Sequence, residues 1–149
     1  MSTLLADTIR KTGGTAGVDI RVKNTSVYES DGGTSVTQNL VQGLAKAWTH
    51  FQGTGTAASV DGLNISSVDD DGTGDFGIHF TNDMGNATYA VTFGADDDGS
   101  SSVVIGSDTT NTTMAAGSFD FESYYVNSTN NRTDYDYANI YIVVHGDLA

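Results

Sequence analysis

From residue 47 to the C-terminus, apolar and polar side chains alternate in short runs that clusters of Asp, Gly, Asn and Ser separate. Tyr89, Val91 and Phe93, for example, alternate with threonine and alanine residues. A period of two places successive side chains on opposite faces of a β-strand, and the separating residues favour turns. We therefore expect seven strands, at residues 47–52, 63–68, 76–81, 88–94, 102–106, 118–126 and 138–145.

Seven short strands with turns between them predict an all-β protein, whose body over residues 47–149 is an antiparallel β-sandwich or a jelly-roll-like fold. The chain of 149 residues is long enough to bury a hydrophobic core in one such domain. It contains no cysteine, which excludes a disulfide framework, a cysteine-based zinc site and a thiol nucleophile. Packing, hydrogen bonds, a hard cation or a partner subunit must therefore stabilise the fold.

Residues 1–34 are rich in Thr, Gly and Ser, and we expect them to form an extended N-terminal arm. Within this arm Val18, Ile20 and Val22 alternate with charged residues, which predicts one short strand with a face to bury. Gly32-Gly33 then breaks the pattern and separates the arm from the rest of the chain.

One short helix is expected at residues 35–48, between the arm and the body. Ser35 and Gln38 have the spacing of a capping box, in which each side chain binds the backbone N–H of the other residue. Because Trp48 ends the helix and opens the first strand, we expect its side chain to be buried there, in the core or between subunits. The apolar residues at helical spacing are Leu40, Val41, Leu44, Ala47 and Trp48.

The net charge of −13 is unevenly distributed. Residues 1–46 hold five basic and four acidic side chains, whereas residues 47–149 hold fifteen acidic side chains and Arg132. An acidic body repels phosphate backbones, so no nucleic-acid partner is expected. No apolar run approaches the roughly 20 residues of a membrane span, so no membrane partner is expected either. The candidate partner-docking residues are the cations of the arm: Arg10, Lys11, Arg21 and Lys23.

Two Asp-rich runs, at residues 69–75 and 96–99, have the oxygen ligands that calcium prefers. The spacing is not that of an EF-hand, because the twelfth residue counted from Asp69 is Phe80. Hairpin turns that carry solubilising charge explain the same residues without any cofactor. Calcium therefore remains the alternative to a protein without cofactors, and its candidate ligands are Asp69, Asp71, Asp75, Asp96 and Asp98.

The sequence contains no recognisable catalytic motif, and we expect a protein that is not an enzyme. Its three histidines occur singly on predicted strands, and no G-x-S-x-G sequence is present. A glycan depolymerase would need paired carboxylates in unlike environments, for which the sequence carries no signal. Among the aromatic residues of the C-terminal third, Phe119 and Phe121 are expected in the core and some of the tyrosines on the surface.

Six phrases stand out along the chain: AKAWTHFQGTGT at 45–56, LNISSV at 63–68, DGTGDF at 71–76, HFTNDM at 79–84, NATYAV at 86–91 and HGDLA at 145–149. Taken in order, these phrases resemble a module of small tailed-bacteriophage structural proteins. The resemblance covers about residues 36–149, and it departs from the family pattern at Gly85, where the family usually has a proline after the methionine.

The resemblance implies a virion structural protein without catalytic residues, on the virion surface and in the host cytoplasm before assembly. It also implies a homotrimer, for which Leu40, Leu44 and Trp48 are the candidate contacts. The first hypothesis is a capsid decoration protein, a cement or short head-fibre protein, whose arm docks on the major capsid protein. The alternative is a tail-fibre or tail-tip adhesin, next to other tail proteins, which binds host surface glycan through loops that carry tyrosine.

Overall fold

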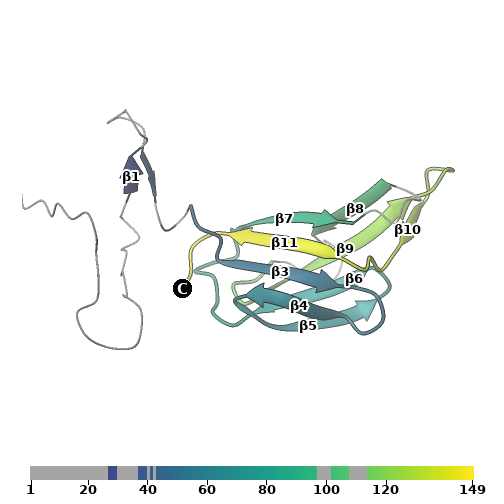
Figure 1. The fold of residues 1–149 in the computed structure, drawn as a ribbon, viewed down its shortest axis with the longest axis horizontal. Helices are drawn as coiled ribbons and strands as arrows, with labels where there is room; N and C mark the ends of the chain where they lie inside the picture. The colour runs from purple at the N-terminus through teal and green to yellow at the C-terminus, as the bar shows by residue number, and fades with distance from the viewer. Residues whose placement is uncertain (1–26, 30–36, 40, 42, 97–101, 108–113) are drawn as a thin grey trace, which may run out of the picture.

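The computed structural model consists almost entirely of β-strands where it describes the chain, and every strand pairing is antiparallel. The described residues are 27–29, 37–39, 41, 43–96, 102–107 and 114–149 (Figure 1). The strands are β1 (Val27–Glu29), β2 (Thr37–Asn39), β3 (Ala47–Gln52), β4 (Ala58–Leu63), β5 (Ile65–Gly72), β6 (Asp75–Phe80), β7 (Ala90–Ala95), β8 (Ser102–Ser107), β9 (Ser118–Val126), β10 (Arg132–Asp134) and β11 (Ile140–His145).

Strands β3 to β11 form two sheets that pack face to face as a sandwich (Figure 1). One sheet has the order β4-β3-β11-β7. The other is built around β9, where Glu122 pairs with Asp75 of β6 on one edge and with Gly106 of β8 on the opposite edge. Strand β10 continues along the edge that β6 occupies, and β5 lies outside β6. The predicted all-β sandwich is therefore confirmed.

The helix predicted at residues 35–48 is wrong. Strand β2 pairs with β1, and the chain then turns before β3 begins. In this turn the amide of Leu44 donates to the carbonyl of Val41 at 3.2 Å. Gly43 weakens a helix that would have been short and marginal, whereas β3 pairs along its length with both β4 and β11. No helix that is long and apolar enough to cross a membrane occurs among the described residues.

Most of the predicted arm lies outside the described residues. These omit residues 1–26 and 30–36, and with them the predicted strand around Ile20 and the Gly32-Gly33 break. The pairing of β1 with β2 shows that the chain reverses direction between Glu29 and Thr37.

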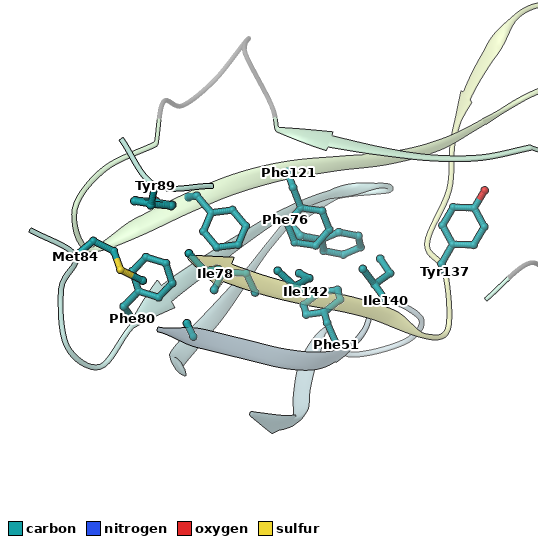
Figure 2. Close-up of a cluster of buried hydrophobic side chains, with 13 residues drawn as sticks. Phe51, Phe76, Ile78, Phe80, Met84, Tyr89, Phe121, Tyr137, Ile140 and Ile142 are labelled. Carbon is teal, nitrogen blue, oxygen red and sulfur yellow. The ribbon is translucent and has the colours of Figure 1, made fainter. Parts of the chain in front are cut away.

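Aromatic rings from both sheets meet in the centre of the sandwich (Figure 2). Phe51 of β3 lies edge-on to Phe76 of β6 and to Phe121 of β9, with ring centroids 5.0 Å and 5.5 Å away. All three side chains are fully buried, as is Phe119, so the predicted core position of Phe119 and Phe121 is confirmed. The other buried apolar residues are Ala47, Ile78, Phe80, Met84, Tyr89, Tyr137, Ile140, Ile142 and Val144.

Gly74, in the turn between β5 and β6, packs under the junction of β9 and β10. Its carbonyl accepts from the amide of Ser123 at 2.7 Å, and its amide donates to Asp136 Oδ1 at 2.7 Å. Its φ is +71°, and a Cβ at this position would lie 2.2 Å from the carbonyl oxygen of Ser123. Only glycine therefore fits, because it adopts this backbone conformation and leaves room for β9.

We predict that Gly74→Ala lowers the free energy of unfolding by about 3 kcal/mol or more, since it adds a steric clash to a strained φ. Gly55→Ala is the matched control, because Gly55 has a φ of +76° but nothing within 4 Å of the added Cβ. The control should lose only about 1 kcal/mol in urea unfolding. Equal losses in the two variants would contradict the packing described for Gly74.

Tyr89 ties the segment before β7 to the start of β9. Its ring is buried, and its hydroxyl lies 2.9 Å from the carbonyl oxygen of Ala115 and 2.8 Å from that of Ser118. Burial, with a smaller contribution from the negative charge of Asp120, raises the pKa of Tyr89 to about 12. The phenol is therefore neutral and acts as a donor at all physiological pH values.

Because the folded pKa of Tyr89 lies above that of an unfolded tyrosine, the folded state retains this proton where the unfolded state has lost it. The stability that Tyr89 contributes is fully present below about pH 10, and we predict that it is lost as the pH rises towards about 12. Urea unfolding across this range should show a weaker pH dependence for Tyr89→Phe than for the natural chain. The same slope in both proteins would contradict the prediction.

Candidate interaction face

A row of apolar side chains crosses the outer face of the four-stranded sheet. Trp48 pairs with Leu63 of β4 on one side and with Val143 of β11 on the other. Trp48 is 37% exposed and Leu63 is 51% exposed, although each belongs to a regular strand. We call Leu63, Trp48 and Val143 the apolar row. Large apolar side chains exposed on adjacent strands are typical of an interaction surface.

The expectation that Trp48 is buried in the core of the chain is wrong. Successive residues of a strand point to opposite faces, and Ala47, Thr49 and Phe51 occupy the inner face of β3. Trp48 must therefore point outward, where a neighbouring subunit could cover it. Leu44, another candidate oligomer contact, is 60% exposed in the turn before β3. Leu40 lies outside the described residues.

Lys46 fixes the turn that leads into the apolar row. Its side chain is only 6% exposed, and its Nζ donates to the carbonyl of Leu44 at 2.8 Å and to that of Val41. Its amide donates to the carbonyl of Val144 at 2.8 Å, which ties the turn to β11. A buried ammonium group requires acceptors of this kind. Although Lys46 belongs to the basic N-terminal segment, its charge is used inside the fold.

A polar and aromatic cluster lies beside the apolar row on the same face. The rings of His50 and Tyr141 stack with centroids 5.2 Å apart and an angle of 26° between their planes. Asp96 Oδ2 accepts from the Tyr141 hydroxyl at 3.3 Å and from Asn139 Nδ2 at 3.0 Å. His50 Nε2 lies 2.8 Å from Asn139 Oδ1, so it carries the proton of that hydrogen bond. We call these four residues the His50–Tyr141 cluster.

The electrostatics of this cluster favour a neutral phenol. Loss of solvent around Tyr141, followed by the negative charge of Asp96, raises the pKa of Tyr141 above its ordinary value. Tyr141 therefore donates to Asp96 at neutral pH and stays in place beside His50. The cluster presents a planar ring pair next to amide and carboxylate groups, an arrangement suited to binding a ligand with one apolar face and several hydroxyls.

The candidate calcium ligands do not come together. Asp69 and Asp71 lie on β5 and Asp75 begins β6, whereas Asp96 follows β7 in the other sheet. Asp98 lies outside the described residues. Asp69 Oδ2 is 2.7 Å from His79 Nε2, and Asp96 belongs to the His50–Tyr141 cluster. In the part of the chain that the structure describes, no three acidic or histidine side chains are grouped so that they could hold a metal ion.

Two carboxylates that the sequence did not connect lie near each other on the outer face of the five-stranded sheet. Gly77 pairs with Asp69 of β5 and with Asp120 of β9. A Cβ on Gly77 would lie 3.0 Å from Asp120 Oδ1 and 3.6 Å from Asp69 Oδ2. The missing side chain at residue 77 thus lets both carboxylates lean over β6. Only the pairing register reveals this, because Asp120 is far from Asp69 and Gly77 in the sequence.

The tyrosines expected on the surface are distributed between the core and the β9–β10 end of the sandwich. Tyr137 is buried, and its ring contacts Tyr135 with centroids 5.0 Å apart. Tyr135 in turn contacts Tyr125 with centroids 5.7 Å apart, and the Arg132 guanidinium lies 4.4 Å from the ring centroid of Tyr124. Tyr141 of β11 is 44% exposed.

The partner-docking cations Arg10, Lys11, Arg21 and Lys23 lie outside the described residues. Their role in docking stays a prediction.

Comparison with known proteins gave no match to a protein-family model, to a curated protein or to a solved structure.

We predict that Trp48→Ala lowers the free energy of unfolding of dilute, dissociated protein by only about 1 kcal/mol, because the side chain is partly exposed. Phe51→Ala, three residues away on the opposite face of β3, should cost about 3–5 kcal/mol. Urea unfolding monitored by circular dichroism measures both values. Comparable losses in the two variants would show that Trp48 is a core residue after all.

Proposed function

We propose that this chain is a non-enzymatic structural protein of a tailed-bacteriophage virion, and that it decorates the head as a cement or short head-fibre protein. The resemblance in residues 36–149 supports this role. Its phrases fall on β3, β5, β6, the segment that enters β7, and the C-terminal end, so they belong to the strands that build the sandwich and to the turns between them. The protein would be located on the virion surface, and in the host cytoplasm before assembly.

The observation that carries the proposal is the exposed apolar row on an otherwise acidic body. Exposed Trp48 and Leu63 lie at the end of the sheet where the N-terminal segment joins β3. Tryptophan is enriched among residues that dominate binding energy at interfaces, and burial of this row would favour association of copies. Leu40, Leu44 and Trp48 remain the proposed contacts of a homotrimer. The cations of the arm would then face an acidic surface of the capsid or tail proteins.

The His50–Tyr141 cluster favours a second candidate function, a tail-fibre or tail-tip adhesin that binds host surface glycan. Sugar rings have an apolar face that stacks on aromatic rings, and hydroxyls that bind amides and carboxylates. Tyr141 and His50 offer the first kind of contact, and Asn139 and Asp96 offer the second. In this alternative the glycan would lie on the sheet face rather than on loops that carry tyrosine.

Electron microscopy of particles from which this protein is missing, after addition of purified full-length protein, tests the proposal. We predict new density on the head shell. A variant with Glu at positions 10, 11, 21 and 23 should attach more weakly, above all at low salt, where charge is least screened. A matched variant with Gln at the same four positions separates loss of attraction from added repulsion and should fall between the two.

Density on the tail would replace the decoration role with the adhesin, and glycan-array binding that Tyr141→Ala abolishes would support that outcome. Absence of density on both head and tail would overturn the virion role itself. A circular dichroism melt of each variant serves as the folding control.

A further inference from the structure

The outer face of the four-stranded sheet has an open area beside Tyr141. In the strand register, Tyr141 of β11 lies between His50 of β3 and Gly94 of β7. Gly94 is exposed, and a Cβ added to it would have no described atom within 4 Å. Strand β7 ends this sheet, since among the described residues it pairs only with β11 (Figure 1). The backbone at Gly94 therefore forms an open floor next to an aromatic ring.

One face of the Tyr141 ring is available to a ligand above this floor. The rings of His50 and Tyr141 stack with centroids 5.2 Å apart, so the imidazole covers the ring face on the side of β3. The opposite ring face is turned toward β7, where Gly94 has no side chain to cover it. Aromatic faces of this kind pack well against the apolar C–H groups of a flat ligand.

Polar groups lie at both ends of the open floor. The Tyr141 hydroxyl and Asn139 Nδ2 both donate to Asp96 Oδ2, at 3.3 Å and 3.0 Å, which holds the carboxylate and the ring in place. Within the part of the chain that the structure describes, no group bonds to Asp96 Oδ1, so this oxygen is available as an acceptor. At the other end, exposed Thr92 lies two residues before Gly94 and adds a hydroxyl on the same face of β7.

We propose that this surface, the Gly94 platform, binds one uncharged sugar ring. The platform consists of Gly94, Tyr141, Thr92 and Asp96. The C–H face of the sugar would pack on the free face of Tyr141, with the sugar ring above the backbone of Gly94. Sugar hydroxyls would donate to Asp96 Oδ1 and bond to the hydroxyl of Thr92. The inference deepens the adhesin alternative of the proposed function and rests on it for the class of ligand.

The charge of Asp96 determines which sugars the platform accepts. An ionised carboxylate accepts hydrogen bonds from hydroxyls but repels a second carboxylate. Residues 47–149 contain a single arginine and no lysine, and that residue, Arg132, bonds to Glu122 and Asp134 in the other sheet. No arginine or lysine of the body therefore offsets the charge of Asp96. We expect neutral hexoses to bind, and sugars with a carboxylate, sulfate or phosphate group to be excluded.

The platform and the apolar row occupy different parts of the same sheet face. The apolar row crosses β4, β3 and β11 at the level of Trp48 and Val143. The platform lies on β7 and β11 at the level of Gly94 and Tyr141, two residues away along β11. Separate substitutions can therefore distinguish binding at these two surfaces.

Saturation-transfer NMR on the full-length protein tests the platform with three neutral probes, the methyl glycosides of glucose, galactose and mannose. We expect transfer to at least one probe, and stronger transfer to the protons of one ring face, because that face would pack on Tyr141. Gly94→Val should weaken binding of this probe about tenfold or more, because the added side chain occupies the place of the sugar. Valine suits an exposed strand, so the circular dichroism melt of Gly94→Val should not move to lower temperature.

Gly106→Val is the matched control. Gly106 also lies on a strand, a Cβ there also meets nothing within 4 Å, and it belongs to the other sheet. This variant should bind the probe as the natural chain does. Absence of transfer to all three probes would overturn the proposal, and so would equal binding by Gly94→Val and the natural chain. Loss of binding in Trp48→Ala but not in Gly94→Val would also overturn it, by placing the sugar on the apolar row.

The uronate of the probe that binds, in which a carboxylate replaces the C6 hydroxymethyl group, tests the selection by charge. It should bind about fivefold more weakly than the neutral probe, and Asp96→Asn should narrow this difference about threefold. Asparagine keeps the shape of Asp96 and an oxygen that accepts from Tyr141. An unchanged difference in Asp96→Asn would overturn the role of Asp96. All of these measurements use purified protein without virions, so failure of the sugar site and failure of the virion role are separate outcomes.

Discussion

The contact between phenylalanine rings of the two sheets is the interaction on which the rest of this structure depends. Phe51 is supplied by the four-stranded sheet, and Phe76 and Phe121 by the five-stranded sheet, with ring centroids 5.0 to 5.5 Å apart. Edge-on and tilted ring pairs of this kind combine a large buried area with favourable electrostatics. The chain has no cysteine to link its sheets, so this contact determines how they are spaced. The outer faces are then free to carry polar, charged and binding groups.

The local pattern was enough to predict those strands that bury one face. The range predicted for β9 is the observed one, and β3 and β6 agree to within a residue, because each has buried side chains at alternate positions. Strand β4 was missed because its sequence, ASVDGL, has no buried side chain, and its place depends on pairing with β3. The helix was predicted partly because Leu44 and Trp48 are four residues apart, which is the spacing of one helical face. In the structure Leu44 lies in a turn and Trp48 lies on β3, so the spacing is a coincidence. On a strand, Trp48 belongs to the face opposite its buried neighbours.

The candidate interaction face could be predicted only in part. Alternation along β11 indicates that Tyr141 points outward, but its stacking on His50 depends on the register between two strands about ninety residues apart. Asp96 and Asn139 join the same cluster from turns whose conformation no sequence pattern specifies. The Asp-rich runs show the opposite case, because Asp69 and Asp96 look alike in the sequence, but Asp69 lies on β5 and Asp96 follows β7 of the other sheet. Proximity along the chain was a poor guide to proximity in space.

The buried Lys46 has a mechanical consequence. The N-terminal segment joins β3, which lies between β4 and β11, so a pull on that segment is directed along β3. Both neighbours are antiparallel to β3, and such a load shears their hydrogen bonds together instead of opening them one at a time. Within the sandwich, the bonds of Lys46 to Leu44 and Val144 lie closest to the point where such a load enters. A pull through the N-terminal segment would therefore be resisted by several hydrogen bonds of β3 at once.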